Sequence, residues 1–179
     1  MTPPLDLTVL RDVAISVAER EDADLRVLGK GGVFDMPELA FAYAVGKEWA
    51  RRLQALHPDR AVKWQREVGD SRGGITDLVM NVEGHRKAYV EFKMADRREA
   101  YLADIQKLRA VEGDIDRVLC LVVDSFDGEL DGRLAHIAPH LEPVGPLSVF
   151  ETKSPRYATP VHCVVGVWTV VPVGPALPS

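Results

Sequence analysis

A strict alternation of apolar and other residues over residues 75–94 constrains the fold more than any other feature of this chain. The apolar side chains recur at every second position in two segments, at Leu78, Met80 and Val82 and again at Ala88, Val90, Phe92 and Met94. Directly opposite residues of an antiparallel pair point to the same side, so both sets can share one face buried under a helix. We therefore predict a hairpin of strands 75–82 and 87–94, in which Gly84 has a positive φ and Asn81 faces His85.

The same register places a second set of side chains together on the opposite face. This set consists of Ile75, Asp77, Val79, Asn81, Lys87, Tyr89, Glu91 and Lys93. A slip of one residue would reverse both faces, so the hydrophobic pattern specifies the register strongly. Two neighbouring carboxylates repel each other unless a positive charge lies between them, and a hard divalent cation such as Mg²⁺ prefers such oxygen ligands. The alternative is a solvated sheet face with a weak Glu91–Lys93 surface pair.

The remaining sequence predicts an α/β domain with a mixed sheet over residues 1–171, followed by a loose proline-rich tail over 172–179. Apolar spacing predicts helices over 6–21, about 35–57, 98–111 and 130–137, and strands over 62–68, 118–123, 147–151 and 161–171. The apolar segment 118–123 is typical of a strand buried on both faces. Asp35 can cap the second helix, with Pro37 in its first turn and Glu38 in a capping-box position.

The acid on the second predicted strand, the Glu-X-Lys sequence on the third and the acid on the preceding helix resemble the PD-(D/E)XK nuclease superfamily. The order helix, three strands, helix, strand over about 35–124 is similar to the common core of that superfamily. This resemblance implies a restriction-endonuclease-like fold, with an αβββαβ core and a mixed central sheet flanked by helices. One position departs from the name-giving motif, because Thr76 stands where the motif has proline.

The resemblance also implies a set of site residues. Asp77, Glu91 and the backbone carbonyl of Phe92 would hold Mg²⁺, or Mn²⁺ in its place, with Glu38 as a further acid. Lys93 would orient or deprotonate the attacking water and offset charge that develops on the phosphorus. For Glu38 the capping box is an equally good explanation.

Three further residues are candidates for contacting substrate phosphate. Gln106 and Lys107 lie on the predicted helix after the hairpin, where related nucleases often place a polar residue near the site. Arg72 belongs to a group of basic residues around the hairpin that could form a phosphate-binding rim, the others being Arg66, His85, Arg86, Lys87, Arg97 and Arg98. The alternatives are an ordinary amphipathic helix and solvated loop charges.

The leading hypothesis is a metal-dependent nuclease that hydrolyses phosphodiester bonds, with DNA expected ahead of RNA by resemblance only. The net charge of −5 argues against a protein that coats nucleic acid by charge alone. A catalytically inactive nuclease fold that serves as a binding or assembly module is the main alternative, and a hydrolase or phosphotransferase acting on a small phosphorylated substrate is a third. We also expect a cytoplasmic protein with no membrane partner, and a homodimer would suit cleavage of both strands of a duplex.

Overall fold

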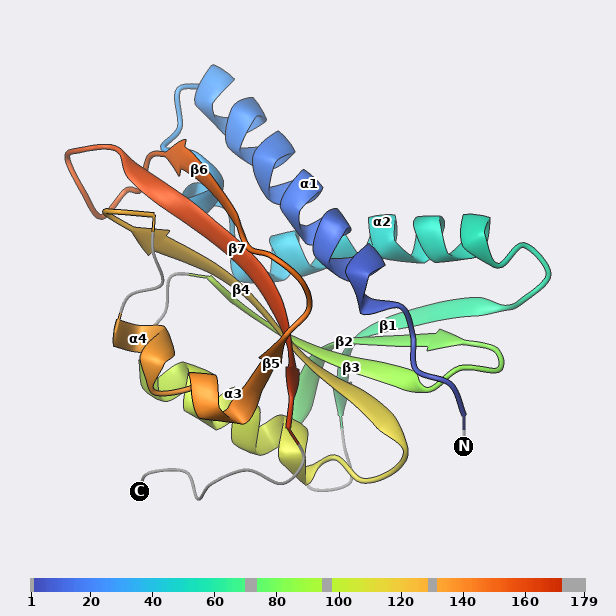
Figure 1. Cartoon of the computed structure of the whole chain (residues 1–179). Coiled ribbons are helices and arrows are strands. Elements are labelled where there is room, and N and C mark those ends of the chain that lie inside the picture. Colours follow the sequence, from blue (N-terminus) through green and yellow to red (C-terminus); the bar gives the residue numbers. More distant parts are fainter. Residues whose placement is uncertain (1, 70–73, 95–97, 129–131, 172–179) are drawn as a thin grey trace.

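The computed structural model describes residues 2–69, 74–94, 98–128 and 132–171, and within them the chain forms a seven-stranded mixed sheet with helices on both faces (Figure 1). This arrangement confirms the expected α/β class and the mixed sheet. The expected tail over 172–179 lies outside the described residues. No helix in the described ranges is long and apolar enough to cross a membrane.

The helical elements are α1 (Leu7–Val27), α2 (Glu38–Leu56), α3 (Arg98–Ala110) and α4 (Gly132–Ala135), with the short 3₁₀ turns η1 (Val33–Asp35) and η2 (Ala138–His140). The strands are β1 (Val62–Gly69), β2 (Ile75–Val82), β3 (Lys87–Met94), β4 (Ile115–Ser125), β5 (Leu141–Pro143), β6 (Ser148–Thr152) and β7 (Val161–Val170). From α2 to β4 the order is helix, three strands, helix, strand, as the sequence predicts.

The sheet has the strand order β1-β2-β3-β4-β7-β5, and β6 pairs with β7 outside this path. Strands β3 and β4 are parallel and are connected through α3, whereas the other paired strands are antiparallel. A parallel connection of this kind needs a crossover, and here α3 supplies it. The crossover places α3 against the face of the sheet that carries Asp77, Glu91 and Lys93.

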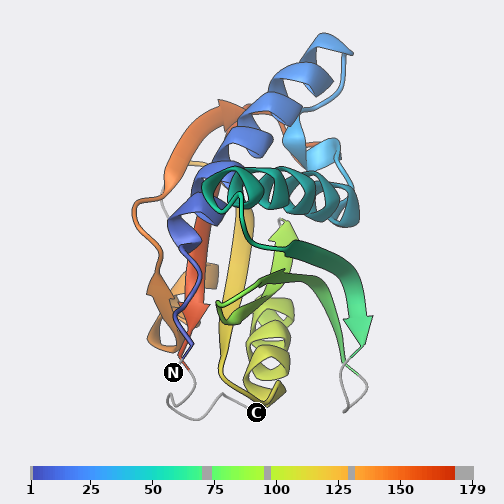
Figure 2. The ribbon, with the colours of Figure 1, turned by 90° about the vertical axis from the view of Figure 1, so that its right-hand side faces the viewer.

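Two hydrophobic cores lie on opposite sides of the sheet. The first packs α1 and α2 against the even-numbered apolar residues of the hairpin, namely Leu78, Met80, Val82, Ala88, Val90 and Phe92. The second packs Tyr101, Ile105 and Leu108 of α3 against Leu119 and Leu121 of β4. Strand β4 therefore contributes alternate residues to both cores and is buried on both faces, as predicted. In Figure 2 the helices α1 and α2 lie on one side of the sheet and α3 on the other.

The hairpin has the predicted bounds, and Gly84 has the predicted positive φ, of 80°. The predicted pairing of Asn81 with His85 is wrong by two residues, because Val79 pairs with Tyr89 and Met80 with Ala88. A shift of two residues keeps every side chain on its predicted face, since the side-chain period of a strand is two. The hydrophobic pattern fixes the faces, whereas the length of the turn fixes the register.

The predicted capping box at the start of α2 is also wrong. The helix begins at Glu38 with Pro37 at the N-cap and no side-chain cap. The Asp35 carboxylate instead accepts a hydrogen bond from the backbone N–H of Gly31 in the preceding turn. The Glu38 side chain is therefore not used in capping, which was the structural alternative to a role in the site.

Candidate functional site

Asp77 lies where the backbone pairing of β2 with β3 ends. The last paired residues at this end are Leu78 and Val90, and beyond them Asp77 Oδ2 accepts a hydrogen bond from Phe92 N at 2.8 Å. The carboxylate thus takes the place of a backbone acceptor of the neighbouring strand. The carbonyl of Phe92 points to the same side as its N–H, because both groups of one strand residue face the same neighbour. The carbonyl predicted as a metal ligand therefore points toward the Asp77 side of β3.

Glu91 is fully buried under α3, opposite Leu119 of β4. Glu91 Oε2 lies 2.6 Å from Lys107 Nζ, whereas Glu91 Oε1 is buried without a hydrogen-bond partner among the described residues. Burial and then the nearby Asp77 carboxylate raise the pKa of Glu91 from 4.5 to about 8, although Lys107 opposes the shift. At neutral pH this carboxyl group is therefore mostly protonated in the metal-free chain.

Lys93 is held between two carboxylates from different helices. Its Nζ lies 3.2 Å from Oε1 of Glu38, at the start of α2, and 3.2 Å from Oδ2 of Asp104, on α3. The other oxygen of Glu38 accepts a hydrogen bond from Met94 N at 3.0 Å. Burial alone would lower the pKa of Lys93, but Asp104 and Glu38 outweigh burial and hold the pKa above its usual range.

Lys107 is the second ammonium group of the cluster. Besides Glu91, its Nζ contacts Asp104 Oδ1 at 3.4 Å and donates a hydrogen bond to the Ile75 carbonyl at 2.8 Å. Its burial also opposes the charged form, and the Glu91 and Asp104 carboxylates raise its pKa nonetheless. Lys107 therefore belongs to the site through its contact with Glu91, and it is not a solvent-exposed lysine on the helix surface.

The described side chains of this cluster bring together four carboxylates and two ammonium groups. The carboxylates are Glu38, Asp77, Glu91 and Asp104, and the ammonium groups are Lys93 and Lys107. With all six groups ionised, the cluster lacks two positive charges. Burial raises the pKa values of Glu38 and Asp104 as well as that of Glu91, which indicates that the described groups do not compensate the charge by themselves.

A divalent cation would supply the missing charge, and the donor set fits one in part. Asp77 and Glu91 offer carboxylate oxygens beside the Phe92 carbonyl, and Glu91 Oε1 is a buried acceptor with no partner among the described residues. The described residues contain no group of three or more His, Cys, Asp or Glu side chains arranged to hold a metal. Lysines contact these carboxylates instead: Lys93 contacts Glu38 and Asp104, and Lys107 contacts Glu91 and Asp104.

Two further sequence-predicted residues are not seen in this cluster among the described residues. Gln106 is exposed on α3, and Arg72 lies outside the described residues. Two described members of the expected basic rim have contacts outside the cluster. Arg66 lies over the ring of Tyr43 at 5.1 Å, and Arg86 forms an ion pair of 2.8 Å with Asp114. Arg97 and the side chain of Arg98 also lie outside the described part of the chain.

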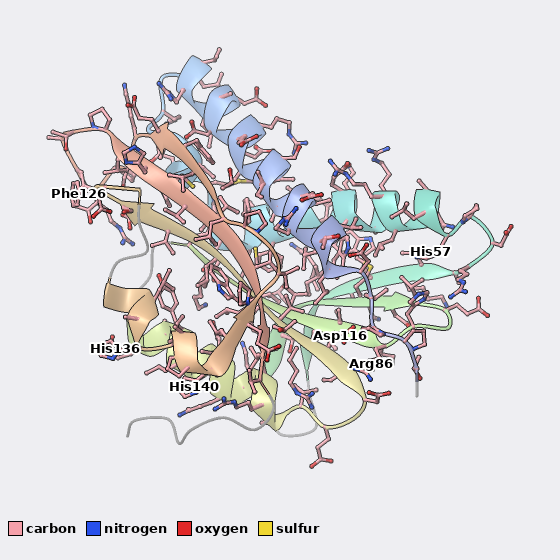
Figure 3. All side chains as sticks on the ribbon, viewed as in Figure 1. His57, Arg86, Asp116, Phe126, His136 and His140 are labelled. Atoms are coloured by element: carbon pink, nitrogen blue, oxygen red, sulfur yellow. The ribbon has the colours of Figure 1, made fainter. Side chains whose placement is uncertain are left out.

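Arg86 has a structural role at the opposite end of the hairpin. Its backbone N–H donates to the Pro3 carbonyl, and Asp116 Oδ2 accepts from Leu5 N at 3.0 Å. Arg86 and Asp116 thus fasten the N-terminal segment to the sheet, where Figure 3 shows their side chains near the N-terminus. These contacts account for Arg86 structurally, and its part in a phosphate-binding rim stays a prediction.

Sequence reasoning missed Asp104 as a site residue. A signal was present, because Tyr101, Asp104, Leu108 and Val111 follow one another at helical spacing along the buried stripe of α3. An acid within an apolar stripe is expected to have a charged partner. Lys107, three residues further along the same helix, is one such partner, and the packing of α3 on the sheet shows that Lys93 is the other.

Comparisons with protein-family models, with curated proteins and with solved structures found no match to this chain.

Proposed function

We propose that this chain is a Mg²⁺-dependent nuclease with a restriction-endonuclease-like core, and that it hydrolyses phosphodiester bonds of DNA. The observation that carries the proposal is the buried Glu91. One of its oxygens has no hydrogen-bond partner among the described residues, and its cluster would lack two positive charges with all six groups ionised. Burying a carboxylate without a full set of hydrogen bonds and compensating charges lowers the free energy of unfolding, and a purely structural role would not explain that cost. A divalent cation bound beside Glu91 removes that cost, which supports a metal site.

The residues that would hold the cation are Asp77, Glu91 and the carbonyl of Phe92. When bound, the cation polarises the phosphodiester and lowers the pKa of a water molecule, so that hydroxide becomes available near neutral pH. The role of Glu38 as a further metal ligand stays a prediction. Its two oxygens contact Lys93 Nζ and Met94 N, so in this proposal Glu38 positions Lys93.

Lys93 stays protonated in this proposal. Because Glu38 and Asp104 hold its pKa above the usual range, Lys93 cannot accept a proton from water near neutral pH. Of the two roles expected for it, orienting and stabilising by charge are therefore favoured over acting as a general base. Its ammonium group offsets the negative charge that develops on the non-bridging oxygens during attack on phosphorus.

The test is a cleavage assay on supercoiled plasmid and on single-stranded DNA, with Mg²⁺ or Mn²⁺ and with EDTA as the metal-free control. The proposal expects cleavage by the parent chain only with metal, and 5′-phosphate ends on the products. Asp77→Asn and Lys93→Met should each lower the rate by at least about 100-fold, the usual scale for losing one group that stabilises transition-state charge. Cleavage that persists in Asp77→Asn would contradict the proposal.

One observation favours a nuclease fold that binds nucleic acid without cutting it. In the described residues the lysines contact the carboxylates that a metal would need, and no ready-made three-ligand group is present. In that case the parent chain binds an oligonucleotide but leaves it intact with every metal. The same assay, with a binding measurement beside it, separates the two functions.

A further inference from the structure

A groove lies on the α3-facing side of β1, β2 and β3. Val79 and Tyr89 of its lining are two residues along their strands from Asp77 and Glu91 of the carboxylate cluster. The groove encloses about 590 Å³, and its lining includes Lys63, Gln65, Asn81, Lys87 and Tyr89. Tyr89 packs at the edge of the core under α3, which places the groove and the cluster on the same face.

Strand register gives the order of residues along the groove. Val79 pairs with both Gln65 and Tyr89, and this row follows directly after Asp77 on β2 and Glu91 on β3. The next row contains Lys63, which pairs with Asn81, and Lys87 at the start of β3. Each row advances about 6.6 Å along the strands, so the lysine row lies about 13 Å from the cluster.

Along the strands the charge changes from the acidic cluster to the two lysines of the groove lining. Lys63 and Lys87 are exposed, and within the described ranges neither ammonium group forms an ion pair. Between them and the cluster lies the half-buried ring of Tyr89, beside the amide groups of Gln65 and Asn81. Lysines suit phosphates, and an aromatic ring suits the flat face of a nucleobase.

We propose that this groove binds single-stranded nucleic acid, with one phosphodiester at the cluster and the neighbouring nucleotides extending over Tyr89 toward Lys63 and Lys87. The proposal rests on the proposed function, because the cluster defines where the strand is cut. A base can stack on Tyr89 only when it has left its own stack, which favours a single strand over a duplex.

The test measures binding without cleavage, in EDTA, by fluorescence anisotropy of a fluorescein-labelled oligodeoxythymidylate. Oligouridylate and a blunt DNA duplex serve as competitors and distinguish DNA, RNA and duplex. The groove variant is Lys63→Gln/Lys87→Gln. Its matched control is Lys47→Gln/Lys153→Gln, which removes the same charge from exposed positions outside the groove.

The groove variant should bind about 25-fold more weakly than the parent at about 0.1 M salt, and its salt slope should be smaller by about 1.4, as for two lost phosphate contacts. The control should keep the slope of the parent. Tyr89→Ala should weaken binding about 5-fold to 150-fold, whereas Tyr89→Phe, which keeps the ring, should not.

Equal binding by the groove variant and its control overturns the groove proposal, and so does a duplex that competes as well as the single strands. If the parent chain cuts with Mg²⁺ while the groove variant binds normally, the nuclease proposal is supported and the groove proposal is overturned. If the parent chain binds through the groove but never cuts, the groove proposal is supported and the nuclease proposal is overturned. A parent chain that neither binds nor cuts overturns both.

Discussion

Replacing Glu91 with glutamine should make the metal-free protein more stable while it removes the proposed nuclease activity. Glu91 is fully buried, and its pKa is raised from 4.5 to about 8 by burial and then by Asp77. Below pH 4.5 the carboxyl group is protonated in both the folded and the unfolded chain, so Glu91 makes no pH-dependent contribution to the free energy of unfolding. As pH rises toward 8, the unfolded chain releases this proton and the folded chain keeps it, which favours unfolding.

The size of the effect follows from the two pKa values. One pKa unit corresponds to about 1.4 kcal/mol, so the free energy of unfolding lost through Glu91 is about 1 kcal/mol at pH 5, about 2 at pH 6 and about 3 at pH 7. Glutamine has nearly the same shape and does not ionise, so Glu91→Gln should regain that amount. For a chain of 179 residues, about 3 kcal/mol corresponds to a rise in Tm of roughly 6–12 °C.

Urea denaturation in EDTA between pH 5 and pH 8 measures this effect, with the parent chain, Glu91→Gln and Glu142→Gln compared at each pH. Glu142 is an exposed glutamate on β5, and its variant controls for the loss of one charge. The gap between Glu91→Gln and the parent should widen with pH, and excess Mg²⁺ should narrow it by stabilising the parent. A gap that is independent of pH, or a Glu91→Gln protein less stable than the parent at pH 7, would refute the reasoning.

Three further outcomes follow from the structure. Mg²⁺ binding at pH 7 should release about 0.9 proton per ion from Glu91, because the ion displaces the proton that the raised pKa keeps on this carboxyl group. Calorimetry in two buffers of different ionisation enthalpy measures the release, and a value near zero contradicts the raised pKa. Glu38→Gln should lower kcat roughly 10- to 100-fold with little change in KM, because Lys93 loses the carboxylate that positions its ammonium group. An unchanged kcat in steady-state cleavage would show that Glu38 has no role in the site. Gly32→Ala should cost at least about 2 kcal/mol in urea denaturation, because Gly32 has φ +116° and a Cβ there would overlap the Asp22 and Thr152 side chains; a neutral variant contradicts this packing.

The hairpin was predictable because its signal is local. Alternation over 20 residues gives both the bounds of β2 and β3 and the face that carries Asp77, Glu91 and Lys93. Apolar spacing likewise predicts α2, α3 and β4 to within a few residues. Helix α1 extends to Val27, beyond the predicted end at residue 21, because its last turn is too polar and exposed to show an apolar stripe. Strand β5, at Leu141–Pro143, has only three residues and contains a proline, so no periodic pattern marks it.

The contents of the site beyond the hairpin depend on tertiary packing. Glu38 has a capping-box spacing in sequence, but the chain places Pro37 at the N-cap and directs Glu38 to Lys93 and Met94. Asp104 and Lys107 reach the cluster only because α3 crosses over β3 and β4. Side-chain spacing along a helix gives the face of the helix but not the residue it meets, so these partners could not be read from the sequence.

The central claim is that a divalent cation binds between Asp77 and Glu91, because the proposed cleavage depends on this cation. Crystals grown with Mn²⁺ and measured at the manganese absorption edge test this claim directly. The account predicts one anomalous peak bordered by the carboxylates of Asp77 and Glu91 and the carbonyl of Phe92, and no such peak in Asp77→Asn crystals. A parent structure without a peak there, with Lys107 still paired to Glu91 at saturating Mn²⁺, would contradict the claim.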